Sequence, residues 1–502
     1  MVYYFRPYFC FILKKIQKKI GFFLGPLAFV FISIIGPFEG LSSEGQSVFA
    51  ATLWIAIWWI TEAIPIAATA LLPIILFPLS GGMELSSTTA AFGHKFVFLY
   101  LGGFLIAIGI EKWNLHKRIA LSIIAFIGSD IRKVILGFMI ATAFLSMWIS
   151  NTATAVMMLP IGIAIIKQLK DNPDTEKNEN IIFGKALMLG IAYSASIGGI
   201  ATLIGTPPNL VLAGVISETY GYEINFLEWF MFGFPIALIL LAFCWIYLTR
   251  FAFTFKQIEF PGGLEEIKRL KQELGPLSFE ERRVGIVFLL AAFSWISRSF
   301  ILQPFFPALD DTIIAMTFGL LLFILPNSTK KEALIHWEDT LKLPWGIILL
   351  FGGGMALAKA FDVSELALWL GELMTSFGSL PLISLLLILV TATNFLTEIT
   401  SNLATTAMLL PVLAPLALEV GIHPFGLMIG ATIAASCAFM LPVATPPNAV
   451  VFGSGYLKIP DMVSKGIILN IFSIFLITAM VYFILPILWG IDLSTFPKML
   501  LP

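Results

Sequence analysis

Two short polar clusters interrupt long apolar stretches of this chain, and they are built from similar residue types. The first is Ser146, Ser150, Asn151 and Thr152, and the second, 251 positions later, is Thr397, Ser401, Asn402 and Leu403. In each cluster two hydroxyl-bearing residues stand four positions apart, a spacing that can place both oxygens on one helical face. Neutral hydroxyl and amide oxygens suit a hard cation such as sodium. The clusters therefore predict a pair of oxygen-lined cation sites.

Two further motifs recur in the same order. Gly102-Gly103 returns as Gly352-Gly353, and Gly205-Thr206-Pro207-Pro208-Asn209 returns as Ala444-Thr445-Pro446-Pro447-Asn448. Three landmarks in one order predict an internal duplication. Because proline lacks an amide donor, each Thr-Pro-Pro-Asn motif is expected to break a helix and to leave backbone carbonyls free as cation ligands.

The clusters also suit an anion, although no basic side chain accompanies them. Residues 134–166 and 360–450 contain neither Lys nor Arg. A helix that begins at such a cluster presents backbone amides and the positive end of its dipole to an anion. A doubly charged solute in a low-dielectric site is costly without counter-charge, so the anion is predicted to be neutralised by helix ends and by co-bound cations.

The elements that must hold these clusters are membrane helices. Hydrophobic residues make up 58% of the 502 residues and charged residues only 12%, about half the charged share of a soluble domain. The net charge of −1 gives no basic excess for nucleic acid. Eleven spans are predicted, measured against the ~20 apolar residues that a crossing needs: 20–38, two within 48–79 separated by a turn at 61–65, 96–110, 184–216, 226–252, 284–302, 312–326, 345–360, 425–452 and 466–489.

The clusters themselves lie in two segments that are not expected to cross. Residues 134–166 and 380–419 each contain two apolar arms of roughly 15 residues, about 22 Å long, which is too short for a hydrocarbon core of about 30 Å. They are predicted to be re-entrant hairpins with the clusters at their tips, the first opening inward and the second outward. Irregular backbone at that depth is tolerated only when it is buried in protein or faces a wet cavity.

Lys and Arg set the orientation, because cytoplasmic loops collect them. The segments predicted inside are all basic: the N-terminus, 111–133, 167–183, 253–283, 327–344 and 453–465. The loops predicted outside contain no Lys or Arg: 39–47, 217–225, 303–311, 361–379 and 420–424. Lys95 and Arg298, near outer helix ends, are exceptions. The N-terminus is therefore predicted inside and the C-terminus outside.

In that orientation the first copy of the duplication starts outside and the second starts inside, so the copies are inverted, as in alternating-access transporters with a central site. The predicted fold is an all-α membrane protein of inverted repeats. Its predicted parts are a cytoplasmic N-terminus (1–19), a first span with its outer loop (20–47), a first inverted repeat (48–252), a cytoplasmic interfacial linker (253–283), a second inverted repeat (284–490) and a C-terminal tail (491–502).

The paired tips, the two Thr-Pro-Pro-Asn motifs and the segment Trp58-Trp59-Ile60-Thr61-Glu62-Ala63-Ile64-Pro65 resemble the divalent anion/sodium symporter family, which includes sodium-coupled dicarboxylate and citrate carriers. The similarity covers residues 20–490. It implies a homodimer in a cell inner or plasma membrane. In each subunit a transport domain would move past a fixed scaffold domain, as an elevator does.

The resemblance also implies roles for individual residues. The first sodium site would use Ser146, Ser150, Asn151 and Gly199, and the second would use Thr397, Thr400, Asn402 and Ala444, partly through backbone carbonyls. Substrate carboxylates would meet Asn151, Thr152, Ser401, Asn402, Thr445 and Pro446. Leu403 departs from the family pattern, which in its fullest form repeats Thr there. This departure bears on affinity and substrate identity and not on sodium coupling.

The leading hypothesis is sodium-coupled uptake of a C4-dicarboxylate such as succinate, malate or fumarate. The alternatives are a dicarboxylate exchanger and a symporter of sulfate or of a tricarboxylate such as citrate. An exchanger is expected to carry basic side chains in place of sodium, and none stands near either tip. A membrane-embedded enzyme is disfavoured because the four histidines all lie near predicted membrane ends. A passive channel is disfavoured because tips dense in ligands hold their solute.

Overall fold

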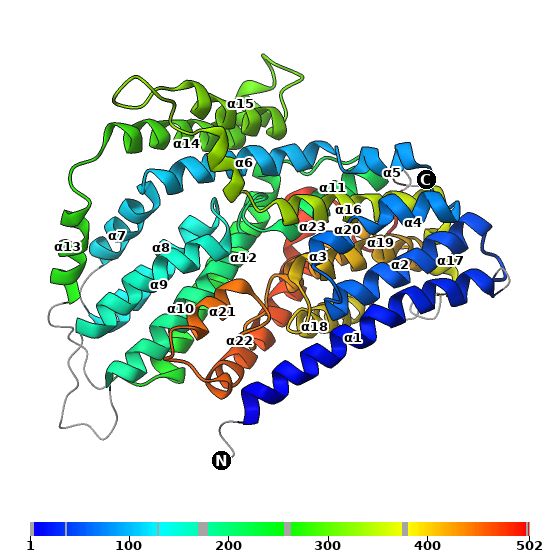
Figure 1. Ribbon diagram of the computed structural model, residues 1–502, viewed down its shortest axis with the longest axis horizontal. Coiled ribbons are helices and arrows are strands. Elements are labelled where there is room, and N and C mark those ends of the chain that lie inside the picture. Colours follow the sequence, from blue (N-terminus) through cyan, green and yellow to red (C-terminus); the bar gives the residue numbers. More distant parts are fainter. Residues whose placement is uncertain are drawn as a thin grey trace.

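The computed structural model is a bundle of helices (Figure 1). It describes residues 5–35, 38–127, 130–168, 179–255, 263–373, 380–497 and 500. The predicted all-helical fold is confirmed, since these residues form no β-strand. Parts of several predicted segments lie outside the described residues: 1–4 of the N-terminus, 169–178 and 256–262 of two inner segments, 374–379 of an outer loop, and 498–499 and 501–502 of the tail.

The first half of the chain runs from the N-terminal helix to a long helix that ends in a π-helical turn. Its helices are α1 (Phe5–Ile34), α2 (Ser43–Thr61), α3 (Ile66–Thr69), α4 (Leu72–Ser80), α5 (Leu85–Ala91), α6 (Lys95–Lys112), α7 (Leu115–Ile127), α8 (Ile131–Ser146), α9 (Asn151–Gln168), α10 (Glu179–Ile200), α11 (Pro207–Tyr220), α12 (Phe226–Ile246) and η1 (Tyr247–Ala252). The predicted turn at 61–65 is confirmed, because α2 ends at Thr61 and Glu62 adopts a left-handed φ of 48°.

The second half begins with an amphipathic helix and then follows a similar order. Its helices are α13 (Gly263–Glu273), α14 (Phe279–Ser297), η2 (Arg298–Leu302), α15 (Asp311–Ile324), η3 (Trp337–Lys342), α16 (Trp345–Val363), α17 (Leu366–Leu373), α18 (Leu382–Leu396), α19 (Asn402–Val420), α20 (Pro424–Ala435), α21 (Pro446–Phe452), α22 (Ile459–Ala479), η5 (Met480–Ile484) and α23 (Leu485–Trp489).

Two of the predicted spans are broken where the Thr-Pro-Pro-Asn motifs stand. The span predicted at 184–216 is formed by α10 and α11, and the one at 425–452 by α20 and α21, with non-helical backbone between the members of each pair. The prolines occupy the first two positions of α11 and α21. At those positions a missing amide costs nothing, because it has no partner within the helix in any case. The prolines therefore start the second helix of each pair.

The hairpin arms are longer than predicted on one side of each tip. The first arms, α8 and α18, have 16 and 15 residues, whereas the second arms, α9 and α19, have 18 and 19. Both second arms continue through a proline, Pro160 and Pro411, which are 251 positions apart like the tips. α19 is one of the eight described stretches that are long and apolar enough to cross a membrane. The estimate of roughly 15 residues fails there because proline can persist inside a membrane helix that is packed in protein.

The two halves pack against each other reciprocally. The broken-helix segment α21 packs against α9 and α10 of the first half, and α11 packs against α19 and α20 of the second half. Figure 1 shows α21 beside α10. In the same way α6 packs against α15, and α16 packs against α3 and α4. Each broken helix thus lies against the hairpin of the other half, as a central site shared between two repeats requires.

The repeated glycine pairs lie at two of these close packings. A Cβ atom on Gly102 of α6 would lie 2.5 Å from the backbone of Ala315 in α15. A Cβ atom on Gly353 of α16 would lie 2.4 Å from the carbonyl oxygen of Ala70, which follows α3. Only glycine permits such close approach of two backbones. The glycine pairs therefore permit close packing of both α6 and α16, through the first glycine of one pair and the second glycine of the other.

The core of the molecule is formed by the broken helices, and the outer helices carry the apolar surface. All 12 residues of α20 are buried. In the apolar window of α10, 83% of the residues are buried, against 17% in the window of α1. Large apolar side chains are exposed on α14 and α22, among them Leu289, Phe293 and Phe475. An apolar surface of this extent indicates contact with lipid.

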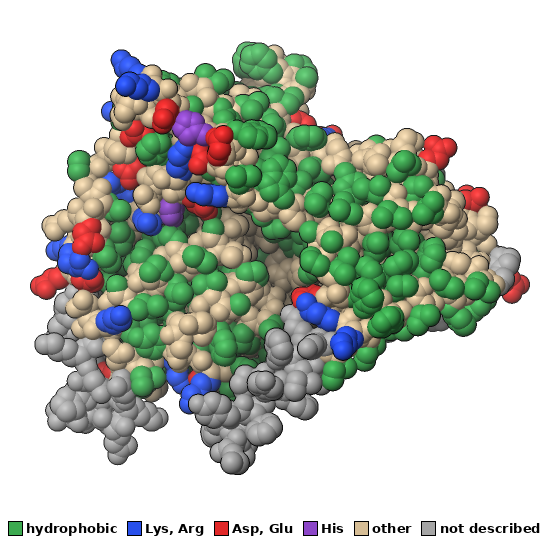
Figure 2. All heavy atoms as spheres, viewed as in Figure 1, with side chains coloured by type: hydrophobic (Ala, Val, Ile, Leu, Met, Phe, Trp, Pro, Cys, Tyr) green, Lys and Arg blue, Asp and Glu red, His purple; other side chains and the backbone are tan. Residues whose placement is uncertain are grey.

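Charged side chains are unevenly distributed along the molecule. In Figure 2 the end drawn at the left carries Lys and Arg together with Asp and Glu, whereas the end at the right shows acidic and no basic side chains on the visible face. The left end contains α7 and α13, which lie within the segments 111–133 and 253–283 that are predicted to be inside. This asymmetry supports the predicted orientation.

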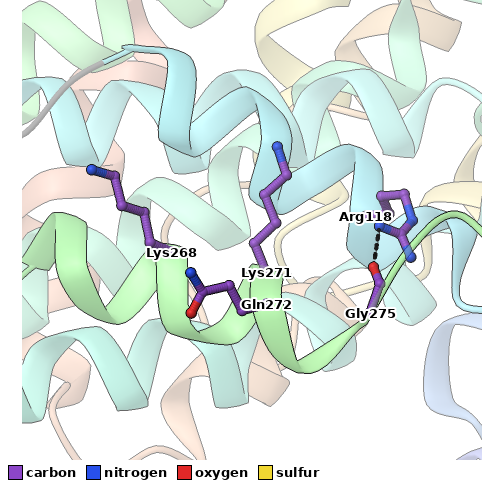
Figure 3. Close-up of a pocket in the computed structure, with 5 residues that line it drawn as sticks. All are labelled: Arg118, Lys268, Lys271, Gln272 and Gly275. Carbon is purple, nitrogen blue, oxygen red and sulfur yellow. Dashed lines mark hydrogen bonds between the residues drawn. The ribbon is translucent and has the colours of Figure 1, made fainter.

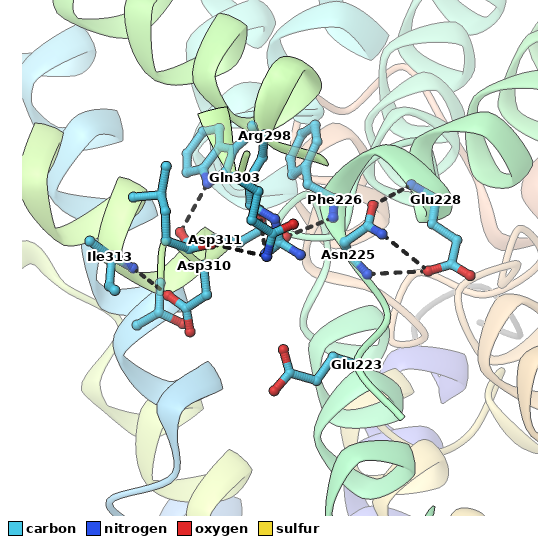
Figure 4. Close-up of polar contacts among 12 residues, drawn as sticks. Glu223, Asn225, Phe226, Glu228, Arg298, Gln303, Asp310, Asp311 and Ile313 are labelled. Atoms are coloured by element: carbon cyan, nitrogen blue, oxygen red, sulfur yellow. Dashed lines mark hydrogen bonds and ion pairs between the residues drawn. The ribbon is translucent and has the colours of Figure 1, made fainter. Parts of the chain in front are cut away.

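The two predicted exceptions to the charge rule are both paired with carboxylates. Lys95 pairs with Glu223, and Arg298 Nη1 lies 3.1 Å from Asp311 Oδ1. Asp311 also accepts a hydrogen bond of 2.7 Å from the backbone nitrogen of Phe226 at the start of α12 (Figure 4). Pairing compensates both positive charges, so neither is an uncompensated cation at an outer helix end.

The helix α13, in the segment predicted as an interfacial linker, packs its apolar face on protein. Its Ile267 is fully buried, and the helix contacts α7 and α9. Arg118 of α7 donates a hydrogen bond of 3.1 Å to the carbonyl of Gly275, just beyond the C-terminal end of α13 (Figure 3). Lys268 and Lys271 line the space between the helices. The helix in the predicted linker is thus amphipathic, and α7 and α9 cover its apolar face.

Candidate functional site

The two polar clusters lie at the turns that join paired helices. α8 ends at Ser146 and α9 begins at Asn151, while α18 ends just before Thr397 and α19 begins at Asn402. Both asparagines therefore occupy the first turn of a helix, where backbone amides lack intrahelical partners. The N-termini of α9 and α19 stand at the tips, as predicted, and carry the positive ends of their dipoles.

The prediction that the two hydroxyls of each cluster lie on one helical face is wrong. Non-helical backbone separates Ser146 from Ser150, and likewise Thr397 from Ser401. Ser150 Oγ instead accepts a hydrogen bond of 3.2 Å from the backbone nitrogen of Ala153 and so caps α9. Ser401 stands at the same position before α19, but its hydroxyl makes no capping hydrogen bond. The spacing of four indicated a helix where the chain in fact turns.

Three residues predicted for the first sodium site lie together. Ser146 Oγ is 2.5 Å from Asn151 Oδ1 and 2.6 Å from the carbonyl oxygen of Ala195 in α10. A Cβ atom on Gly199 would lie 2.8 Å from Asn151 Oδ1, so glycine is needed at this approach. A hydroxyl has a single proton and can donate to only one of two acceptors. The surplus of oxygen atoms around Ser146 is the arrangement that a cation would relieve.

The second tip repeats this geometry. Thr397 Oγ1 lies 2.8 Å from Asn402 Oδ1 and 2.8 Å from the carbonyl oxygen of Ala435 in α20. Again one hydroxyl faces two acceptors. Thr400 does not bring its hydroxyl to this group, because its Oγ1 lies 2.6 Å from Thr405 Oγ1. A role of Thr400 as a ligand would have to fall to its backbone carbonyl, and it stays a prediction.

Two asparagines to which the sequence assigned no role hold the broken helices open. Asn209 Nδ2 donates to the carbonyls of Gly199 at 3.2 Å and Thr202 at 2.8 Å. Asn448 Nδ2 donates to the carbonyls of Ala438 at 3.2 Å and Leu441 at 3.0 Å. These are the last residues of the two Thr-Pro-Pro-Asn motifs, and their partners differ by the same 239 positions as the motifs do.

These contacts correct the expectation that the broken helices leave their carbonyls without partners. Each asparagine amide takes the place of the helical donors that are missing at the break, and Asn209 does so at the carbonyl of Gly199, a predicted sodium ligand. A carbonyl oxygen has two lone pairs, so it can accept this hydrogen bond and still bind a cation. The Oδ1 atoms of Asn209 and Asn448 are buried and have no hydrogen-bond partner in the described part of the chain.

Ala444 and Glu398 complete the surroundings of the second tip. Ala444 is buried in the turn between α20 and α21, and its contact with Asn402 stays a prediction. Glu398 is buried and accepts hydrogen bonds from the backbone nitrogens of Phe439, Met440 and Leu441 at 2.8 to 3.0 Å. Its carboxylate thus fastens the tip to the turn that follows α20, which indicates a role in packing.

The residues predicted to meet the substrate differ in exposure. Thr152 and Pro446 are exposed and Ser401 is half-buried, whereas Thr445 is buried at the start of α21. Because α21 packs against α9, the second motif approaches the helix that begins at the first tip. Leu403 is only 5% exposed and lies in the hydrophobic core. Its environment is therefore unlike that of Thr152, its counterpart in the first tip.

The oxygen atoms at the tips form an uncharged donor set. Within the described ranges, no group of three or more His, Cys, Asp or Glu side chains could hold a metal ion. The atoms that converge at Ser146 and Thr397 are hydroxyl, amide and backbone carbonyl oxygens. Hard cations prefer oxygen ligands, and soft transition metals prefer thiolate or imidazole. The residues present therefore fit sodium, the ion that the sequence predicts.

Reciprocal halves, buried broken helices and mirrored polar tips define a multi-pass membrane transport protein. The chain belongs to the family described as the sodium:sulfate symporter transmembrane region, which matches residues 17–491. This confirms the family resemblance found in the sequence. Relatives that match over nearly their full length support the same family. The sodium-dependent dicarboxylate transporter SdcS of Staphylococcus saprophyticus is 46% identical over 486 residues, with 96% of this chain and 94% of the relative covered.

Another relative and two solved structures extend the comparison. The sodium-dependent dicarboxylate transporter SdcS of Staphylococcus aureus (strain USA300) is 45% identical over 502 residues, covering 97% of this chain and 96% of the relative. The YdaH transporter of Alcanivorax borkumensis has a TM-score of 0.59 at 16% identity and covers 90% of this chain and all of its own. MtrF of Neisseria gonorrhoeae has a TM-score of 0.57 at 15% identity, with 88% and 95% covered. The two structures share the fold, and the relatives are transporters rather than enzymes.

Proposed function

We propose that this protein takes up C4-dicarboxylates such as succinate, malate and fumarate together with sodium ions, by alternating access. The observation that carries the proposal is the pair of hydroxyls, on Ser146 and Thr397, that each face two acceptor oxygens. A monovalent cation between these oxygens would remove their mutual repulsion. The names of the relatives that are 46% and 45% identical support the same ion and the same class of anion.

The proposed ligands follow the prediction and the geometry together. In the first sodium site they are Ser146, Ser150, Asn151 and Gly199; in the second, Thr397, Thr400, Asn402 and Ala444; and at the anion, Asn151, Thr152, Ser401, Asn402, Thr445 and Pro446. The two sodium ions and the N-termini of α9 and α19 supply the counter-charge for the dianion, since residues 134–166 and 360–450 carry no Lys or Arg. Binding of the anion thus depends on prior binding of sodium.

Alternating access would move one unit of the molecule past another. The proposed moving unit contains both hairpins, both broken helices and the helices packed against them, α8–α12 and α18–α22. The proposed scaffold contains α1–α6 and α14–α16, in which α6 packs closely on α15. The predicted repeat boundaries, 48–252 and 284–490, place one hairpin and one broken helix in each half. The elevator movement and the homodimer are supported by the family resemblance.

The proposed location is a cell inner or plasma membrane, with the N-terminus in the cytoplasm and the C-terminus outside. The distribution of basic side chains in Figure 2 supports this orientation. Attachment of a reporter to each terminus would test it. One suitable reporter is active only in the cytoplasm. Its activity at the C-terminus would contradict the proposed orientation.

Transport in proteoliposomes tests the function directly. Purified protein is expected to accumulate radiolabelled succinate when an inward sodium gradient is imposed, and to lose this uptake when potassium replaces sodium. Ser146→Ala and Thr397→Ala are expected to raise the sodium concentration needed for half-maximal uptake. Ser33→Ala, which removes an exposed hydroxyl of α1, is the matched control and should leave it unchanged. Succinate uptake that does not depend on sodium would contradict the proposal.

Competition separates the proposed substrate from the alternatives. The description of the family names sulfate, and the resemblance also includes citrate carriers. Unlabelled succinate, malate and fumarate are expected to inhibit labelled succinate uptake more strongly than sulfate or citrate at equal concentration. Trans-stimulation of uptake by internal dicarboxylate in the absence of sodium would favour an exchanger instead.

A further inference from the structure

A cavity of about 520 Å³ lies between α9, the turn from α6 to α7, and η3. On the hairpin side it is lined by Ile149, Ala153 and Thr154, which flank the first tip. Thr154 is 1% exposed, and its hydroxyl has no hydrogen-bond partner in the described part of the chain. The cavity therefore extends from the first tip along α9, and a buried hydroxyl without a partner lies in its wall.

The opposite wall of this cavity is positively charged. It carries Lys112, Lys117 and Lys342. Lys112 Nζ lies 2.6 Å from Asp339 Oδ2, and Lys342 interacts electrostatically with Glu111. Lys117 is exposed and has no ion pair with a described residue. Three ammonium groups against two carboxylates leave a net positive charge where the cavity meets the predicted inner loops.

We propose that this cavity, the inner vestibule, is the route by which the dianion moves between the first tip and the cytoplasm, and that Lys117 and Lys342 attract the dianion into it. The inference rests on the proposed function. At the tip the anion is neutralised by helix ends and cations, and it loses both when it leaves. The lysines then supply counter-charge along the route.

Lysine side chains suit the guidance of an anion along a route better than the rigid ligands of a binding site would. An ammonium on a flexible stem attracts an anion without fixing its geometry, so it can guide the solute without holding it. A cleft lined by one sign of charge raises the local concentration of the opposite ion. The effect is screened by salt, with a Debye length of about 8 Å at physiological ionic strength, so it acts over the dimensions of the vestibule.

Thiol labelling tests the charge of the vestibule without relying on transport. Val156 lines the cavity and is 52% exposed, while Cys244 and Cys437 are buried. In a C10S background, V156C would be labelled in inverted membrane vesicles with an anionic and a cationic methanethiosulfonate reagent. K117Q/K342Q is expected to lower the ratio of the anionic to the cationic rate by about tenfold. K330Q/K331Q removes two exposed lysines of the loop before η3 and should leave the ratio unchanged.

Transport kinetics measured separately from the two sides of the membrane test the route itself. In K117Q/K342Q the internal succinate concentration needed for half-maximal efflux is expected to rise several-fold, while the external concentration for half-maximal uptake stays the same. A V156C thiol that does not react from the cytoplasmic side, an unchanged rate ratio, or equal changes on both sides would overturn the vestibule while sodium-dependent uptake persists. Loss of sodium-dependent uptake in the unmodified protein would instead overturn the proposed function.

Discussion

Thr152 and Leu403 occupy matched positions in the two tips, but their surroundings differ. Thr152 is exposed, whereas Leu403 is 5% exposed within the hydrophobic core. The absence of a hydroxyl at the second tip is therefore accompanied by burial of that position. We therefore expect the two tips to contribute unequally to the proposed anion site, with the hydroxyl of Thr152 available to a carboxylate and no counterpart at Leu403.

Substitution at each of the two positions tests this inequality. T152V is expected to raise the half-saturating dicarboxylate concentration about tenfold, since a hydrogen bond to a charged group contributes about 1.5–3 kcal/mol, and to leave the Tm unchanged. L403T is expected to lower the Tm without improving affinity, because a buried hydroxyl that lacks a partner costs about 1–3 kcal/mol. Uptake kinetics and thermal unfolding of the purified protein measure both. Tighter binding by L403T at unchanged Tm would show that Leu403 faces the substrate.

Asn209 offers a test of the first broken helix. N209A removes the donor from the carbonyls of Gly199 and Thr202, and the loss of a buried hydrogen-bond partner costs about 1–3 kcal/mol. We expect the sodium concentration for half-maximal uptake to rise about tenfold, with a parallel loss of sodium-dependent thermal stabilisation. Asn225→Ser, which retains a capping side chain at the start of α12, is the control. Wild-type sodium dependence in N209A would exclude Asn209 as a positioning residue.

The sequence could predict the residue types of the site better than their contacts. The contact of Ser146 and Thr397 with an asparagine follows from residues that are close together in sequence. The second acceptor oxygen, a carbonyl of α10 or α20, does not. The partners of Asn209 could not be foreseen from spacing, because a side-chain amide that replaces helical donors leaves no periodic pattern. One signal was present and unused: Asn209 and Asn448 recur at the offset of their motif.

At the scale of elements, the duplication depends on close helix packing as much as on the polar tips. G102V would place side-chain atoms where a Cβ alone already lies 2.5 Å from the backbone of Ala315. Overpacking costs about 1–3 kcal/mol and sometimes more, so we expect a marked loss of Tm and of monodisperse protein in size-exclusion chromatography. G103A is the matched control, because its Cβ would lie 3.5 Å from the side chain of Ile204, an ordinary contact. Equal stability of the two variants would contradict the close packing of α6 on α15.

The existence and order of the elements could be read from hydropathy, and their lengths could not. The turn at 61–65 and the breaks at the two Thr-Pro-Pro-Asn motifs lie where the sequence predicts them. The second arms α9 and α19 run further than expected because Pro160 and Pro411 remain inside them. Proline disfavours a helix locally, but neighbouring elements can satisfy the freed carbonyl. Such tertiary compensation is invisible to a local reading of the chain.

At the scale of the whole molecule, the charges that report orientation also join the proposed moving unit to the proposed scaffold. Lys359 of α16 lies 3.1 Å from Glu218 of α11 through Nζ and Oε1, and Lys95 of α6 pairs with Glu223 between α11 and α12. We name these two contacts the outer ion pairs. Both would have to break if α11 and α12 moved past α6 and α16, whereas the inner vestibule is already open to the first tip in this conformation.

Removal of the outer ion pairs should therefore favour the state that opens outward. Partly exposed ion pairs contribute about 0.2–1 kcal/mol each, so E218Q/E223Q is expected to lower the external half-saturating dicarboxylate concentration by about twofold to tenfold, since apparent affinity rises with the population of the competent state. The effect should shrink at high salt, because screening already weakens the pairs in the unmodified protein.

The control is D461N, which breaks the 2.9 Å pair between Lys185 of α10 and Asp461 of α22. Both helices belong to the proposed moving unit and would keep their contact throughout the cycle. Initial rates of sodium-driven uptake over a range of external succinate concentrations measure the shift. If E218Q/E223Q raised this concentration, or if D461N lowered it equally, the outer ion pairs would not be the contacts that hold the outer side closed.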